Sequence, residues 1–210
     1  MIVILDYGMG NSSSILNMIR KVGGDARISV DSADLETASA FVLPGVGAFD
    51  NGMQKLNDLG LVEVLRRQVC DQGTPFLGVC LGMQLLFEGS DEGELSGLGW
   101  LKGSVRRFDF SEFEDKSRLK VPHMGWNQIK PVDYSNLFAG LEEEARFYFV
   151  HSFYVECENP EDILANCTYG IEFPCAVHKA NIWGAQFHAE KSHKYGMALF
   201  RNFLSEVRHS

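Results

Sequence analysis

Cys80 lies in the sequence pattern of this chain that most clearly indicates chemistry. In Gly78-Val79-Cys80-Leu81-Gly82, a glycine stands two residues away on each side of a nucleophilic side chain. The pattern follows an apolar run and precedes further apolar residues, which predicts a tight turn from a buried strand into a helix that exposes the sulfur as a nucleophile. Side chains in place of the glycines would clash where strand and helix approach each other. The short motif equally fits a buried, inert cysteine in a glycine-rich turn.

The predicted turn supplies two aids to a cysteine nucleophile. The sulfur would lie at a helix N-terminus, whose positive end favours the reactive thiolate. The backbone N–H of Leu81 would point toward an oxyanion formed on the substrate. The segment PGVG at 44–47 also ends an apolar run, and its glycines let the backbone approach a substrate. That segment also fits an ordinary strand-ending turn, whereas a phosphate loop is disfavoured because no Lys-Ser/Thr pair follows.

A cysteine nucleophile needs a general base, and His188 is the best placed histidine of the six. It follows an apolar run, and Glu190 lies two residues further on, on the same side of an extended chain. The carboxylate could hold the imidazole tautomer. His188, Glu190 and His193 form H-x-E-x-x-H, which departs from the helical zinc motif H-E-x-x-H, so we expect no metal. We interpret His151 and His178 as hydrogen-bonded strand histidines.

Composition limits the classes of protein to which the chain can belong. The 210 residues suit one domain over 1–210, and the net charge of −9 disfavours a nucleic-acid partner. Asp6 interrupts the N-terminal apolar run, which predicts neither a signal peptide nor a membrane span. The five cysteines are odd in number and contain no CxxC pair, which favours a reducing cytoplasm over disulfides or zinc. We expect the other four to be inert.

The elements that must position these residues change character along the chain. In the first half, apolar runs at 2–5, 26–30, 40–44 and 75–79 alternate with helical spacing at 12–22 and 60–72. This alternation predicts parallel strands joined by helices. In the second half, aromatic and β-branched stretches at 100–108, 119–130, 146–156, 163–168, 173–178 and 181–188 precede a closing helix at 194–207. We therefore predict an α/β fold: a mixed, mainly parallel central sheet flanked by helices, with antiparallel strands in the C-terminal half.

Taken together, PGVG, GVCLGMQLLF and QFHAEK resemble the class I glutamine amidotransferases. Within that family, DYGMGN, LPGVGAFD, GLGW, VPHMGWN and YFVHSFY are similar to the glutaminase subunit of imidazole glycerol phosphate synthase. The similarity spans essentially the whole chain. It implies the family fold, hydrolysis of glutamine without a cofactor, and transfer of the ammonia to a synthase partner.

The resemblance also implies a role for individual residues. Cys80 would be the nucleophile, His188 the base and acid, and Glu190 the residue that orients His188. The resemblance further implies Val46 or Gly47 beside Leu81 for the oxyanion, Gly47, Gln84 and Ser152 for the substrate, and Asn11, Met124, Trp126 and Asn127 for the partner interface. Judged without the resemblance, Trp126 is a core residue and Asn127 a turn residue.

Two departures from the family pattern leave the partner open. The family usually reads FHPEKSQ where this chain has FHAEKSH, so Ala189 and His193 replace a proline and a glutamine. The sequence KSHKYG also resembles a side branch that supplies ammonia to an ATP-dependent amidotransferase of N-acetyl sugars for surface polysaccharide. Cyclase and sugar-amidating partners both fit, and we favour the cyclase of histidine biosynthesis.

Two rival functions use the same residues. A cysteine peptidase or a DJ-1-like hydrolase would keep the strand-to-helix turn and change the substrate. A regulatory subunit with an inactive site is disfavoured because Cys80, His188 and Glu190 are all present.

Overall fold

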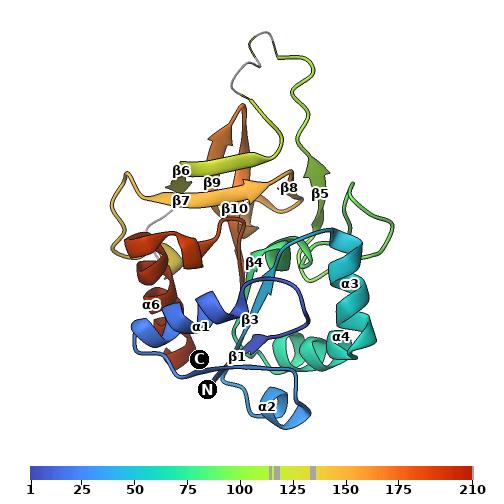
Figure 1. Ribbon diagram of the computed structural model, residues 1–210, viewed down its shortest axis with the longest axis vertical. Helices are drawn as coiled ribbons and strands as arrows, with labels where there is room; N and C mark the ends of the chain where they lie inside the picture. Colours follow the sequence, from blue (N-terminus) through green and yellow to red (C-terminus); the bar gives the residue numbers. More distant parts are fainter. Residues whose placement is uncertain (114, 116–118, 133–135, 210) are drawn as a thin grey trace.

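The computed structural model describes residues 1–113, 115, 119–132 and 136–209 (Figure 1). Its strands are β1 (Ile2–Leu5), β2 (Ala26–Ser29), β3 (Ala40–Gly45), β4 (Phe76–Cys80), β5 (Gly103–Arg107), β6 (His123–Pro131), β7 (Arg146–His151), β8 (Phe153–Cys157), β9 (Ile163–Tyr169), β10 (Ile171–Lys179) and β11 (Ile182–Ala185). Its α-helices are α1 (Ser12–Lys21), α2 (Ser32–Glu36), α3 (Phe49–Asp58), α4 (Leu61–Leu65), α5 (Leu81–Gln84) and α6 (His193–His209). A π-helical turn, η1, covers Arg66–Asp71, and 3₁₀ turns η2, η3 and η4 cover Asn136–Phe138, Pro160–Asp162 and Ala189–Lys191.

Within the described residues, nine strands form one sheet in the order β2-β1-β3-β4-β11-β10-β9-β6-β7. The neighbours from β2 to β11 run parallel, whereas those from β11 to β7 run antiparallel. Strands β5 and β8 form a small antiparallel sheet of their own. The predicted mixed sheet, parallel first and antiparallel later, is confirmed.

The parallel strands are buried on both faces because helices cover each side. Along β1, Ile2 and Ile4 pack toward one core and Val3 and Leu5 toward the other. The first core includes apolar residues of α1 and α6, and the second those of α3 and α4. Figure 1 shows these helix pairs on opposite sides of the parallel strands. Strands buried on both faces carry continuous apolar runs, as the sequence predicted.

Two helical predictions differ from the structure. The segment 60–72 is divided into α4 and the π-helical η1, although Leu61, Leu65 and Val69 are buried as predicted. Helix α3 was not predicted, yet it buries Phe49, Met53 and Leu56 at helical spacing. Helix α2 was not predicted either.

The stretch 146–156 is not one strand. β7 ends at His151 and β8 begins at Phe153, and the two strands belong to different sheets. The break leaves Ser152 between the main sheet and the small one. None of the helices in the described part of the chain is long and apolar enough to cross a membrane.

Candidate active site

The backbone at Cys80 forms the predicted strand-to-helix turn. Cys80 ends β4 with φ 55° and ψ −112°, a conformation that non-glycine residues rarely adopt. A Cβ at Gly78 would lie 2.5 Å from the carbonyl oxygen of Gly82, and a Cβ at Gly82 would collide with the carbonyl oxygen of Leu43. Both glycines are therefore sterically required, and strain of this kind is typical of catalytic positions.

The helix that follows Cys80 is shorter than the sequence suggested. Helix α5 contains four residues, closed by a hydrogen bond from Leu85 N to Leu81 O of 2.9 Å. A macrodipole builds up from aligned peptide units, so one turn contributes less than a full helix. The helix dipole at Cys80 is therefore weaker than the sequence predicted.

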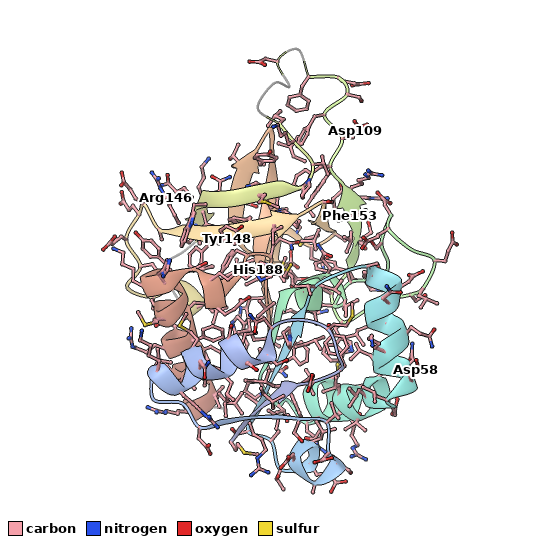
Figure 2. The ribbon with its side chains drawn as sticks, viewed as in Figure 1. Asp58, Asp109, Arg146, Tyr148, Phe153 and His188 are labelled. Carbon is pink, nitrogen blue, oxygen red and sulfur yellow. The ribbon has the colours of Figure 1, made fainter. Side chains whose placement is uncertain are left out.

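His188 and Glu190 are paired as predicted, through a different backbone geometry. His188 Nδ1 lies 2.8 Å from Glu190 Oε1, and both side chains are almost fully buried. The predicted reason, an extended chain, is wrong, because Glu190 belongs to the 3₁₀ turn η4. His188 N donates to the Tyr148 carbonyl at 2.8 Å, and Ser192 Oγ donates to the His188 carbonyl at 2.7 Å. Figure 2 labels His188 and Tyr148 near the middle of the molecule.

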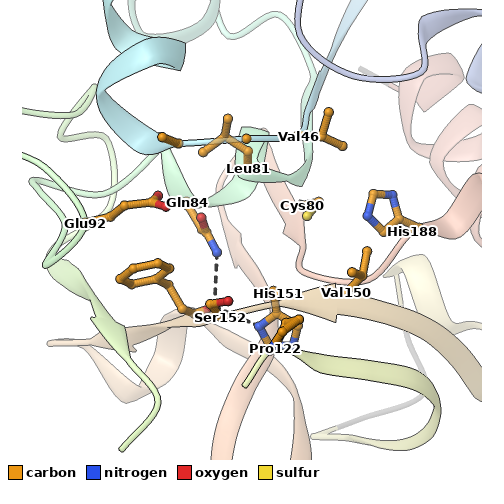
Figure 3. A pocket seen from close by; sticks show the side chains of 13 residues that line it. Val46, Cys80, Leu81, Gln84, Glu92, Pro122, Val150, His151, Ser152 and His188 are labelled. Carbon is orange, nitrogen blue, oxygen red and sulfur yellow. Dashed lines mark hydrogen bonds between the residues drawn. The ribbon is translucent and has the colours of Figure 1, made fainter. Parts of the chain in front are cut away.

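The environment of His188 favours its charged form. Burial lowers the pKa of the imidazole, but the interactions with Cys80 and Glu190 outweigh that effect and raise the pKa to about 9. Among the described residues, His188 Nε2 has no partner within ordinary hydrogen-bond distance. The ring and the Cys80 sulfur line the same cavity (Figure 3). Nε2 is thus the ring nitrogen left to exchange a proton with Cys80 or a substrate.

A cavity of about 410 Å³ opens over Cys80. It brings together all the residues that were predicted for catalysis, oxyanion and substrate except Glu190, which contacts His188 from behind. The residues around it are Val46, Gly47, Ala48, Cys80, Leu81, Gln84, Glu92, Pro122, Val150, His151, Ser152, Phe153 and His188. The volume suits a small substrate such as an amino acid.

The PGVG segment lies next to the nucleophile. Gly45 at the end of β3 is paired in register with Cys80, so Val46 and Gly47 pass directly over the turn. Gly47 has φ 103°, which favours glycine. The oxyanion role of Val46, Gly47 and Leu81 stays a prediction that this placement supports.

Glu92 was not identified from the sequence, although it lines the cavity. Its Oε2 accepts a hydrogen bond of 2.9 Å from the backbone N–H of Phe49, at the start of α3. Glu92 lies in the irregular chain after α5, where no periodic pattern marks a residue, so only the fold could place it here.

The predicted interface residues lie outside the cavity. Met124 and Trp126 on β6 are 62% and 46% exposed, so the interpretation of Trp126 as a core residue is wrong. Asn127 belongs to the same strand and is not in a turn. Asn11 caps α1 by accepting a hydrogen bond from Ser14 N at 3.2 Å.

His151 and His178 fit the interpretation as hydrogen-bonded strand histidines, and three of the other four cysteines fit the inert one, whereas Cys70 is exposed and does not. His151 Nδ1 donates to the Phe153 carbonyl at 2.7 Å, and His178 Nε2 lies 2.6 Å from the Ala180 carbonyl. Burial raises the pKa of Cys157 and of Cys167 to about 12, which keeps both thiols protonated. Burial also raises the pKa of Cys175 well above its usual range.

The possible metal ligands do not cluster. The His193 ring stacks on Trp126 with centroids 5.5 Å apart. Across the ranges that the structure describes, no three His, Cys, Asp or Glu side chains gather in a way that could hold a metal ion.

Solved structures share this fold at low sequence identity. A structure described as a glutamine amidotransferase superposes with a TM-score of 0.76 at 18% identity and covers 99% of this chain and 98% of its own. PurLQS from Thermotoga maritima superposes with a TM-score of 0.74 at 14% identity and covers 98% of each chain.

Curated relatives are much closer in sequence. The imidazole glycerol phosphate synthase subunit HisH 2 of Pseudomonas aeruginosa is 50% identical over 207 residues, 99% of this chain and all of the relative. The HisH subunit of Bdellovibrio bacteriovorus is 48% identical over the same shares. The family described as "Glutamine amidotransferase class-I" matches residues 3–207. The chain therefore belongs to the class I glutamine amidotransferase family.

Proposed function

We propose that this protein is the glutaminase subunit of a two-subunit synthase, with Cys80 as nucleophile, His188 as base and acid, and Glu190 as the residue that orients His188. The observation that carries the proposal is the alignment of these residues at one cavity: the sulfur and the imidazole line it, and Glu190 holds His188 Nδ1 at 2.8 Å. In a Cys-His-carboxylate arrangement of this kind, the carboxylate fixes the tautomer that leaves Nε2 toward the nucleophile.

The first half-reaction forms a thioester. The Cys80 thiolate attacks the carboxamide carbon of glutamine, forming a C–S bond and a tetrahedral oxyanion. Backbone N–H groups of Leu81 and of Val46 or Gly47 stabilise that oxyanion. The His188 imidazolium then gives its proton to the nitrogen as the C–N bond breaks, and ammonia leaves.

The second half-reaction restores the cysteine. Neutral His188 takes a proton from water as the oxygen attacks the thioester carbon. The C–S bond breaks, the Cys80 thiolate and His188 imidazolium are regenerated, and the new carboxylic acid loses its proton to solvent as glutamate leaves. Every bond change is accounted for without a metal or an organic cofactor.

Glu92 suits the other end of the substrate. It is the carboxylate among the cavity residues, and glutamine carries an α-ammonium group that a carboxylate binds well. The hydrogen bond from Phe49 N holds one oxygen, and the charge remains available to the ligand. Gln84 and Ser152 line the same cavity and supply polar contacts.

The partner is inferred from the relatives, whose names describe a subunit of imidazole glycerol phosphate synthase. We propose that Met124 and Trp126 contact a cyclase that accepts the ammonia, together with Asn11 and Asn127. The number and distribution of the cysteines favour a cytoplasmic location.

The test is a cysteine substitution with a matched control. Cys80→Ser should abolish glutamine hydrolysis, whereas the exposed Cys70→Ser should leave it unchanged. With the cyclase added, Cys80→Ser should still support synthesis from free ammonia. Glutaminase activity retained by Cys80→Ser would overturn the proposal. Synthesis with a sugar-amidating partner in place of the cyclase would correct only the partner.

A further inference from the structure

Gln186 lies behind the nucleophile, outside the cavity. Its side chain is fully buried, and its Nε2 lies 3.7 Å from the Cys80 sulfur, within hydrogen-bond range for sulfur. Its backbone N–H donates to the Cys175 carbonyl at 2.9 Å, which fixes the residue just beyond β11. The amide can therefore contact the sulfur without contacting a substrate.

The direction of this hydrogen bond follows from a backbone carbonyl. Gln84 Nε2 lies 3.1 Å from the Phe153 carbonyl oxygen (dashed in Figure 3). A carbonyl oxygen only accepts, so the amide nitrogen of Gln84 must face it. The second N–H of that nitrogen donates to Gln186 Oε1 at 2.9 Å. The other end of the Gln186 amide, facing Cys80, is then necessarily its NH₂ group.

The same carbonyl fixes a second series of hydrogen bonds. His151 Nδ1 lies 2.7 Å from the Phe153 oxygen, so the proton of the neutral ring is on Nδ1. His151 Nε2 must accept, and it lies 3.0 Å from His123 Nδ1, which must donate. His123 Nε2 then accepts from Asn127 Nδ2 at 3.3 Å, and the same nitrogen donates to the Thr168 carbonyl at 2.9 Å.

The rings of this second series are firmly held. The His123 ring stacks between Phe149 and Tyr169, with centroid distances of 4.8 and 4.1 Å. Burial lowers the pKa of His123 to about 4 and that of His151 to about 3, so both rings are neutral at pH 7, as the assignment requires. The donor and the acceptor of each hydrogen bond in this series are therefore fixed.

We propose that Gln186 is a positioning residue that donates an N–H to the Cys80 sulfur, and that the Phe153 carbonyl, shared by His151 and Gln84, fixes the direction of that donation. The inference rests on the proposed role of Cys80 as nucleophile. A donor aimed at the sulfur stabilises the thiolate over the thiol. It also leaves the amide oxygen of Gln84 as the part of that side chain able to accept a hydrogen bond from a substrate.

This series continues from the cavity to the strand with the exposed residues Met124 and Trp126. His123 and Asn127 belong to β6, and His151 ends β7. The sulfur is thus joined by one run of hydrogen bonds to the strand that we assign to the partner interface.

The first experiment replaces Gln186 by the similarly shaped Met, which has no donor. Iodoacetamide is added at pH 7, and alkylation of each cysteine is followed by mass spectrometry of the peptides. We expect Cys80 in Gln186→Met to react at least tenfold more slowly than in the wild type, while exposed Cys70 reacts at the same rate in both. In turnover, kcat should fall by a similar factor while KM for glutamine changes less than threefold, because Gln186 does not line the cavity. Equal alkylation rates for Cys80 would overturn the proposal.

The second experiment needs no substitution, so it stands even if Gln186→Met fails to fold. Two-bond ¹H–¹⁵N correlation spectra of the wild-type protein at pH 7 report which ring nitrogen of each histidine carries the proton. We expect His123 and His151 both to carry it on Nδ1. A proton on Nε2 of either ring would overturn the inferred direction of the second series, which the proposal includes through the shared Phe153 carbonyl. Neither measurement depends on glutamine turnover, so either can fail while the proposed function holds, and glutaminase activity can be absent while both succeed.

Discussion

His188 Nδ1 and Glu190 Oε1 lie 2.8 Å apart in an almost fully buried pair. The contact is made across a 3₁₀ turn, between residues separated by one position in sequence. It directs the second ring nitrogen toward the cavity that contains Cys80. The charge state of this pair governs the pH dependence of the proposed reaction.

Glu190→Gln should shift the alkaline limit of activity to lower pH. The pKa of His188 is about 9 because the interactions with Cys80 and Glu190 outweigh burial. The imidazolium that protonates the departing amide nitrogen is therefore present below pH 9 and lost above it. Without the carboxylate the pKa falls, so the descending limb of kcat/KM against pH moves to lower pH and kcat drops by about 100-fold or more. Glu142→Gln, at an exposed ion pair with Lys194, is the matched control. An unmoved alkaline limb would contradict this role for Glu190.

Glu92→Gln should weaken substrate binding more than catalysis. The amide can still accept from Phe49 N, but the charge for the α-ammonium group is gone. A hydrogen bond to a charged group contributes about 1.5–3 kcal/mol, which corresponds to a rise in KM of about 10- to 100-fold. Steady-state kinetics measure it, with exposed Glu94→Gln as the control. If KM stays the same, Glu92 does not bind the ammonium group.

The buried pair His123 and His151 should make the fold sensitive to acid. Their folded pKa values, about 4 and about 3, lie below the ordinary value of 6.5, so between these values the unfolded chain binds protons that the folded one cannot. Their stabilising contribution is complete above pH 6.5 and is lost as pH falls toward the folded values. Protonation of each histidine in the unfolded chain should lower the free energy of unfolding by about 2 kcal/mol as the pH falls from 7 to 5.

Denaturant titrations at the two pH values test this sensitivity. In His123→Phe the loss between pH 7 and 5 should be about 2 kcal/mol smaller than in the wild type, whatever the variant's stability at pH 7. His178→Gln, at a half-buried strand position, should show the wild-type loss. An identical loss in His123→Phe would show that His123 does not resist protonation in the folded protein.

Gly82→Ala should destabilise the turn at Cys80. A Cβ there would collide with the Leu43 carbonyl, and overpacking in a rigid core costs about 1–3 kcal/mol. We expect a lower melting temperature and loss of Cys80 alkylation selectivity over Cys70. Gly89→Ala, where a Cβ meets nothing within 4 Å, should behave as wild type. Equal melting temperatures for the two variants would show that the turn tolerates a side chain.

Trp126→Ala should weaken association with the synthase partner at least tenfold while changing the melting temperature little, because the side chain is 46% exposed. Its ring stacks on His193 and meets Tyr148 edge-on, and it is not part of the buried core. Leu59→Ala, exposed at the end of α3, is the control for loss of a surface apolar group. Calorimetric titration with the partner gives both affinities. Equal affinities would place the interface elsewhere.

What the sequence predicted well depends on local sterics and periodicity. The turn at Cys80 was predictable because glycines stand two residues away on each side of the nucleophile, and Gly78 is required by a contact with Gly82 within the turn itself. The contact of Gly82 with the Leu43 carbonyl on β3 became visible only in the fold. The parallel half was predictable because strands buried on both faces are apolar throughout. The spacing of His188 and Glu190 indicated a contact, although the chain brings it about through a turn.

What the sequence did not predict depends on contacts between distant segments. The exposure of Trp126 depends on which face of β6 is covered, and alternation along a strand does not specify that. Glu92 reaches the cavity because Phe49 N, 43 residues away, holds it. Gln84 and Gln186 are 102 positions apart in sequence, so neither their contact nor the direction of their hydrogen bond could be inferred before the fold was known.

The central claim is that the Cys80 sulfur attacks the carboxamide carbon of glutamine. Its most direct test is to quench the complex with acid during turnover of isotopically labelled glutamine and to map the label by mass spectrometry. We predict a glutamyl thioester on the peptide that contains Cys80 and none on the peptide with Cys70. Turnover without label on Cys80, or label on another side chain, would contradict the account.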